Sequence, residues 1–68
     1  MTQNVKNIYS GYARAMQHRG ESWERLATRA AVAEAARKSL LAEGFSALAW
    51  NLEGEVSGYY DLMRGCPQ

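Results

Sequence analysis

The sequence has too few cysteine and histidine residues for the usual covalent or metal-based ways of stabilising a small protein. Cys66 is the only cysteine and His18 the only histidine among 68 residues. The chain therefore cannot form an internal disulfide, and a closed zinc site of Cys and His ligands cannot be built from one copy. We predict no metal and no cofactor for this protein.

Long apolar runs and an excess of one charge are also missing. No apolar run approaches the ~20 residues that cross a bilayer, and the N-terminal MTQNVK lacks the apolar core of a signal peptide. The net charge of +1 provides no bulk attraction for nucleic acid. We therefore expect a cytoplasmic protein that does not enter the membrane and does not have nucleic acid as its main partner.

Residues that could carry catalysis are sparse and badly spaced. Glu53 and Glu55 are two positions apart, so on a helix they point to different sides and do not form an acid–base pair. Cys66 lies close to the C-terminal end, with one histidine in the whole chain to activate it. The sequence contains no glycine-rich phosphate loop. We expect no enzymatic activity.

What the sequence does contain is apolar spacing typical of a long α-helix. Steps of three and four residues connect Val5, Tyr9, Tyr12, Met16, Arg19, Trp23, Leu26, Ala30, Ala33, Arg37 and Leu40. Such steps place side chains on one helical face. The pattern predicts one helix over about 4–43, roughly 60 Å long at ~1.5 Å per residue. The alternative is a kink or break near Gly20, because glycine costs about 1 kcal/mol inside a helix and Ser22 could begin a second one.

A shorter helix is expected over about 46–64, after a stop at Gly44, which suits the left-handed position that ends a helix. Gly54 and Gly58 are four residues apart and share one side, where another helix could pack closely. The short connection makes the two helices antiparallel. The prediction is a single all-α domain over 1–68, an antiparallel helical hairpin. Since the short helix covers only part of the long one, we expect a homodimeric helical bundle.

Two sets of residues follow from this hairpin. The predicted core or dimer interface consists of Tyr9, Met16, Leu26, Leu40, Leu48, Leu52, Val56 and Tyr59. The uncovered part of the long helix is basic and aromatic, and such residues are enriched at binding hot spots. The predicted partner-binding residues are Tyr12, Arg14, His18, Arg19, Trp23 and Arg25. The alternative is that the aromatic residues of this segment form only the homodimer core.

Two stretches of the chain carry a resemblance to a known type of protein. These are ERLATRAAVAEAARKSLLAEGF (24–45) and EVSGYYDLMRG (55–65), in a short helical chain without site chemistry. The chain resembles small host-takeover proteins of bacteriophages, in particular the quorum-sensing anti-activator of Pseudomonas phages. The resemblance implies a helical dimer in the host cytoplasm that binds a transcription activator or a pilus-assembly ATPase. It transfers no function to individual residues.

The predicted function is accordingly a protein-binding inhibitor that masks a functional surface of a host protein. The alternative is a structural or assembly subunit whose exposed seam builds an oligomer. A small DNA-associated regulator is the third hypothesis.

Overall fold

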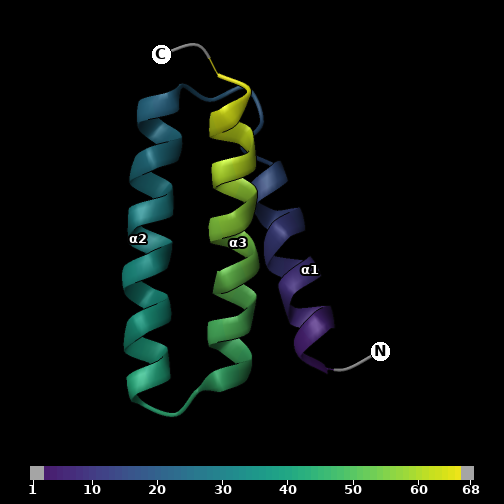
Figure 1. The fold of residues 1–68 in the computed structure, drawn as a ribbon, viewed down its shortest axis with the longest axis vertical. Helices are drawn as coiled ribbons and strands as arrows, with labels where there is room; N and C mark the ends of the chain where they lie inside the picture. Colours follow the sequence, from purple (N-terminus) through teal and green to yellow (C-terminus); the bar gives the residue numbers. More distant parts are fainter. Residues whose placement is uncertain (1–2, 67–68) are drawn as a thin grey trace.

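The computed structural model describes residues 3–66, and its secondary structure in that part is entirely helical. The helices are α1 (Gln3–Met16), α2 (Trp23–Ala42) and α3 (Ser46–Arg64). Helix α3 lies between the other two and packs against both, whereas α1 and α2 are not neighbours (Figure 1). Helices α1 and α3 run in the same direction, and α2 runs opposite to them. The all-α prediction is confirmed, with α2 and α3 forming an antiparallel pair.

The prediction of one long helix over about 4–43 is wrong, and the alternative of a break near Gly20 is confirmed. Gly20 has a φ of 97°, a left-handed conformation that ends helical continuity. The Ser22 hydroxyl accepts the Arg25 backbone N–H at 3.2 Å and caps α2. The break allows α1 to fold back against α3. The resulting packing outweighs the helical hydrogen bonds that an uninterrupted helix would have kept.

Helices α1 and α3 approach each other so closely that their backbones touch. A Cβ atom on Gly11 would lie 1.7 Å from the carbonyl oxygen of Asn51. A Cβ on Gly54 would lie 1.9 Å from the carbonyl oxygen of Ile8, and one on Gly58 would lie 2.5 Å from the Cβ of Ala15. The prediction that Gly54 and Gly58 admit a closely packed helix fits this geometry, and that helix is α1. At the other connection Gly44 has a φ of 85°, as its place after the helix stop requires.

The core is built mainly of small side chains. Its buried apolar residues are Ala15, Leu26, Ala30, Ala33, Ala49, Val56 and Tyr59. Among the predicted core residues, Leu26, Val56 and Tyr59 are buried, and Met16, Leu40 and Leu52 are half-buried.

Two predicted core residues lie outside the core of the single chain. The side chains of Tyr9 and Leu48 are 64% and 55% exposed. Tyr9 is displaced because α1 turns Gly11 and Ala15, rather than its aromatic residues, toward α3. A role for Tyr9 and Leu48 at a dimer interface stays a prediction.

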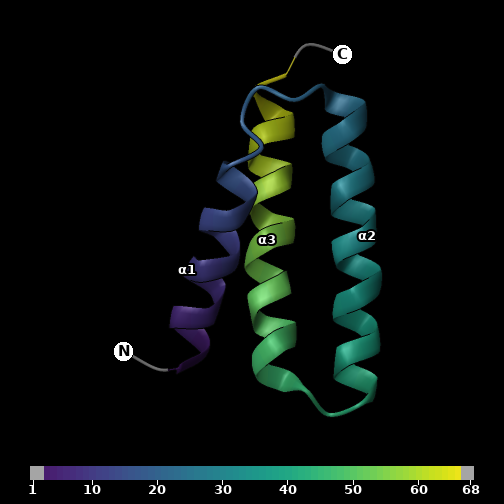
Figure 2. The ribbon, with the colours of Figure 1, turned by 180° about the vertical axis from the view of Figure 1, so that it is seen from behind.

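The three helices form a single layer. Helices α1 and α2 lie on either side of α3 and do not contact each other, so the three helices are side by side rather than in a triangle, as the view from behind also shows (Figure 2). No fourth element within residues 3–66 covers either broad side of this layer. Domains are normally built from two packed layers, so this one lacks a covering layer. None of the helices within residues 3–66 meets the length and apolarity needed to span a membrane.

Candidate binding surfaces

Most aromatic side chains of this protein do not contribute to its core. The chain has two Trp, four Tyr and one Phe, and all seven lie in the described part. Only Tyr59 is buried, Tyr12 and Trp23 are half-buried, and the other four are exposed. The core is filled by alanine instead, so the large apolar side chains are available on the surface.

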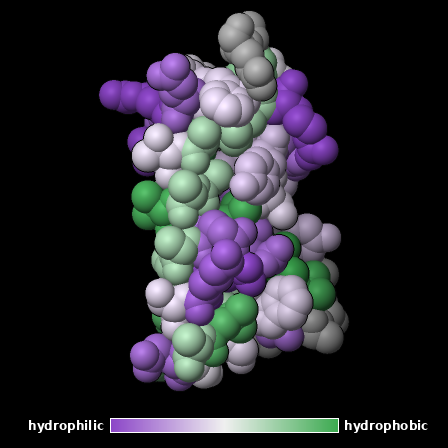
Figure 3. Space-filling view, turned by 60° about the vertical axis from the view of Figure 1, so that its left-hand side comes forward, coloured by the Kyte–Doolittle hydropathy of each residue, from purple (hydrophilic) through white to green (hydrophobic). Residues whose placement is uncertain are grey.

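Four of these aromatic residues, Tyr12, Trp23, Trp50 and Tyr60, lie around one broad side of the layer, here named the aromatic face. Trp23 and Tyr60 line a hollow of about 380 Å³ together with Ser57, Asp61, Met63 and Arg64. The Tyr12 hydroxyl donates to Asp61 Oδ2 at 2.6 Å, which connects α1 to the edge of this hollow. Trp50 lines a smaller hollow of about 230 Å³ further along the seam between α2 and α3. Figure 3 shows pale ring-shaped side chains beside purple charged groups on this side.

Ion pairs hold the charged residues of the aromatic face in place. The Arg37 guanidinium contacts Glu34 Oε1 at 2.5 Å and Glu53 Oε2 at 3.4 Å, linking α2 to α3. Arg64 pairs with Asp61 on α3. At the adjoining end of the molecule, Arg19 is exposed and lines another hollow with Trp23. Arg19 has no carboxylate within ion-pair distance among residues 3–66.

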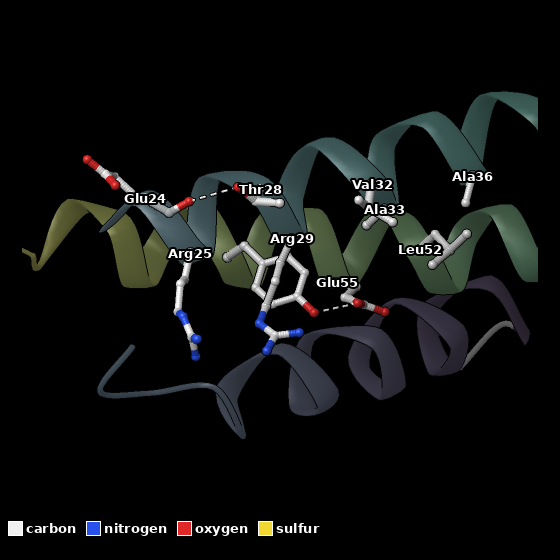
Figure 4. Close-up of a pocket in the computed structure, with 10 residues that line it drawn as sticks. Glu24, Arg25, Thr28, Arg29, Val32, Ala33, Ala36, Leu52 and Glu55 are labelled. Carbon is white, nitrogen blue, oxygen red and sulfur yellow. Dashed lines mark hydrogen bonds between the residues drawn. The ribbon is translucent and has the colours of Figure 1, made fainter. Parts of the chain in front are cut away.

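The opposite broad side contains a groove of about 600 Å³ along α2, with Leu52, Glu55 and Tyr59 of α3 as its floor. One end is apolar and is lined by Val32, Ala33, Ala36 and Leu52. The other end is charged, and there Arg25 and Arg29 extend from α2 toward α1 (Figure 4). On α3, Leu52, Glu55 and Tyr59 share one helical side, whereas Ser57, Tyr60 and Arg64 share another. The groove and the aromatic face are therefore on different sides of the layer.

At the charged end of the groove, side-chain hydrogen bonds hold the segment between α1 and α2 in place. Glu21 accepts hydrogen bonds from Arg29 at 2.7 and 3.1 Å and lies 2.9 Å from His18 Nδ1. The hydrogen bonds from Arg29, and then the one with His18, lower the pKa of Glu21 to about 2. This cluster joins the segment between the helices to the body of α2.

A second set of contacts joins α1 to the floor of the groove. Arg14 donates to Glu55 at 2.6 Å, and the Tyr59 hydroxyl donates to the other oxygen of Glu55 at 2.5 Å. Burial, followed by the hydrogen bond to Glu55, raises the pKa of Tyr59 to about 12. Tyr59 also packs against the His18 ring, with their centroids 5.8 Å apart. These contacts order the groove without any bound partner.

The depressed pKa of Glu21 predicts a loss of stability in acid. A carboxylate with a lowered folded-state pKa stabilises the fold above its ordinary value of 4.5, and this contribution is lost as the pH falls toward 2. We expect Glu21→Gln to unfold at lower urea concentration than the wild type at pH 7, with the difference closing near pH 2. Urea unfolding followed by circular dichroism at both pH values measures this. Glu24→Gln is the control, because the Glu24 side chain is exposed and forms no ion pair within residues 3–66. A difference that stays constant with pH would contradict the prediction.

The structure distributes the predicted partner-binding residues over both sides of the layer. Tyr12 and Trp23 lie at the aromatic face, and Arg19 lies at its end. Arg14, His18 and Arg25 belong to the groove and its charged end. Trp50 and Tyr60 of the aromatic face do not belong to the predicted partner-binding set, and it is their exposure in the structure that identifies them.

Within residues 3–66, His, Cys, Asp and Glu side chains do not gather in any group of three that could hold a metal ion. Cys66 packs against the core, and its thiol lies 3.7 Å from the carbonyl oxygen of Glu21. Comparisons with protein-family profiles, with curated proteins and with solved structures find no match to this chain.

Proposed function

We propose that this protein is a non-catalytic binding module that covers part of the surface of another protein, and that the aromatic face makes the contact. The observation that carries the proposal is the exposure of its aromatic residues while alanine fills the core. Trp and Tyr side chains bury a large area in an interface and lose little conformational entropy on binding. Residues of these types are enriched at hot spots, where truncation to alanine costs at least ~2 kcal/mol of binding free energy. Their place on one side of a rigid layer favours such a role.

Several side chains of the aromatic face are already held in position by neighbouring residues, which supports the same proposal. Tyr12 is held by Asp61, and Arg37 is held by Glu34 and Glu53. Side chains that are already positioned lose less freedom on binding, which increases affinity.

The balance of unpaired charges favours an acidic or mixed partner surface. Four cationic side chains in residues 3–66 have no carboxylate within ion-pair distance, namely Lys6, Arg19, Arg25 and Lys38. In the same part of the chain, only Glu24 and Glu43 are unpaired carboxylates. Arg19 lies next to Trp23, where an acidic residue of the partner could pair with it.

The proposed consequence of binding is inhibition, because a small module that covers a functional surface blocks access to it. The resemblance to phage anti-activators implies a transcription activator or a pilus-assembly ATPase of the host as target, with binding in the host cytoplasm.

The test removes the aromatic face and leaves the rest of the surface intact. We expect a tagged wild-type chain to capture a host protein from bacterial lysate, and Trp50→Ala/Tyr60→Ala to retain less than a tenth of that signal by quantitative mass spectrometry. Phe45→Ala is the matched control, since Phe45 is an exposed aromatic residue at the turn between α2 and α3. Far-UV circular dichroism establishes that all three chains are folded. Equal capture by all three would contradict the aromatic face as the binding site. Recovery of nothing but the chain itself would favour the assembly-subunit alternative.

A further inference from the structure

A stripe of residues on α2 borders the groove and contributes little to the protein's own core. It consists of Arg25, Arg29, Val32, Ala36, Ser39 and Glu43, at successive steps of four, three, four, three and four residues. This is the spacing of a helix that packs along a second helix as a coiled coil. The side of α2 that faces α3 is different and includes Leu26, Ala30 and Ala33. Val32, in the middle of the stripe, is 66% exposed.

The stripe is symmetric in position and opposite in charge at its ends. Val32 and Ala36 lie two residues either side of position 34, and Arg25 and Glu43 lie nine residues either side of it. Arg25 and Glu43 are both exposed, and neither has an ion-pair partner within residues 3–66. A second copy placed antiparallel on the stripe would therefore bring each Arg25 to the Glu43 of the other chain. A parallel copy would bring like charges together.

We propose that a second copy of this chain covers the groove side, with α2 packed antiparallel against the α2 of its partner about a two-fold axis. Small residues at the centre let the two helices approach closely, and Val32 is buried beside Ala36 of the other copy. Two Arg25–Glu43 ion pairs close the contact at its ends, about 27 Å apart at ~1.5 Å per residue. The pairing is self-complementary, as a two-fold interface requires.

The size of the groove side and the single-layer fold both favour a second copy of the chain as the partner. The broad side of 36 × 25 Å has a footprint of about 900 Å², close to the ~800 Å² that each partner buries in a stable interface. Stacking two single layers gives the two-layer architecture of an ordinary domain. The apolar end of the groove, including Leu52, would be covered at the same time. The dimer leaves both aromatic faces outward, so it is independent of the proposed function and compatible with it.

Exchange of the two end charges tests both the partner and its direction. We expect the wild-type chain to sediment as a dimer at micromolar concentration in analytical ultracentrifugation. Arg25→Glu and Glu43→Arg should each raise the dimer dissociation constant about tenfold or more, because each places two like-charged pairs in the contact. The double variant Arg25→Glu/Glu43→Arg should return it to within a few-fold of wild type. A monomeric wild type, single variants that dimerise as well as wild type, or a double variant without recovery would each overturn the proposal.

A substitution at the centre of the stripe provides a second measurement. Val32→Glu should abolish the dimer, while Ala31→Glu should leave it unchanged, because Ala31 is exposed and, as the adjacent residue in the chain, points to another side of α2. Since both positions are exposed, both variants should keep their far-UV circular dichroism. Equal sedimentation of the two variants would overturn the proposed interface even if the chain proved dimeric.

Discussion

Gly54→Ala should detach α1 from α3. The added Cβ would lie 1.9 Å from the carbonyl oxygen of Ile8 and 2.9 Å from its Cα, so it would meet backbone rather than a side chain that can move aside. Overpacking a well-packed site costs typically 1–3 kcal/mol, and we expect about 3 kcal/mol here because neither backbone can yield locally. A chain of this size has a total stability of only about 3–10 kcal/mol. A cost of this size is a large fraction of the total stability, so we expect α1 to lose most of its packing against α3.

The sign of the effect makes this experiment decisive. Helix propensity alone predicts that Gly→Ala inside α3 stabilises the protein by about 1 kcal/mol. Urea unfolding of the two chains measures the difference, and hydrogen exchange shows whether the amides of α1 lose protection before those of α2. Gly65→Ala is the control, because the nearest atom to its added Cβ is 3.6 Å away. A Gly54→Ala chain more stable than the wild type would show that α1 does not pack on α3 as described.

Leu26→Asp should prevent folding. Leu26 is fully buried, and among the described residues 3–66 it is the largest side chain that is less than 2% exposed. Truncating a buried leucine to alanine already costs 2–5 kcal/mol, and an unpaired buried carboxylate adds a desolvation penalty. The sum reaches the whole stability expected for a chain of this length, so we expect a loss of the cooperative thermal transition and of most helical signal.

Two other leucines test whether the burial of the side chain determines how much stability a Leu→Asp substitution costs. Leu52→Asp should weaken the fold less than Leu26→Asp, since Leu52 is only half-buried at the floor of the groove. Leu41→Asp should change stability by less than about 0.5 kcal/mol, the usual range for surface positions, because Leu41 is 48% exposed. Circular dichroism melts of the three variants check this order. A cooperative melt for Leu26→Asp near that of the wild type would contradict the assignment of Leu26 to the core.

The sequence was sufficient for features that depend on a few neighbouring residues. The helix end at Gly44, the close approach at Gly54 and the burial of Leu26 and Val56 all agree with the structure. Each depends on local backbone preference or on side-chain spacing within one helix, and both can be read from the residue order.

The arrangement of the predicted partner-binding residues around the layer did not follow from the sequence, for a geometrical reason. The apolar steps continue from Met16 to Trp23 across residues 17–22, so the pattern looks like one uninterrupted helical face. The segment between them is not helical, and α1 turns its glycine and alanine side toward α3 instead. Tyr12 and Arg14 of the predicted partner-binding set are two residues apart within α1, and they lie on different sides of the layer as that spacing requires.

The sequence alone thus determined that this protein is helical, where α2 ends and α3 begins, and that Leu26 and Val56 enter the core. These outcomes follow from propensity and periodicity, which act over one or two helical turns. Only the tertiary structure decided that α1 breaks away at Gly20 and lies on the far side of α3. The outcome depends on two competing free energies. One is that of the hydrogen bonds of a continuous helix, and the other is that of packing Gly11 and Ala15 against Gly54 and Gly58, which are about forty residues away. The same outcome leaves a single layer with an aromatic face on one side and an open groove on the other, because α1 and α2 pack on different flanks of α3 and do not contact each other.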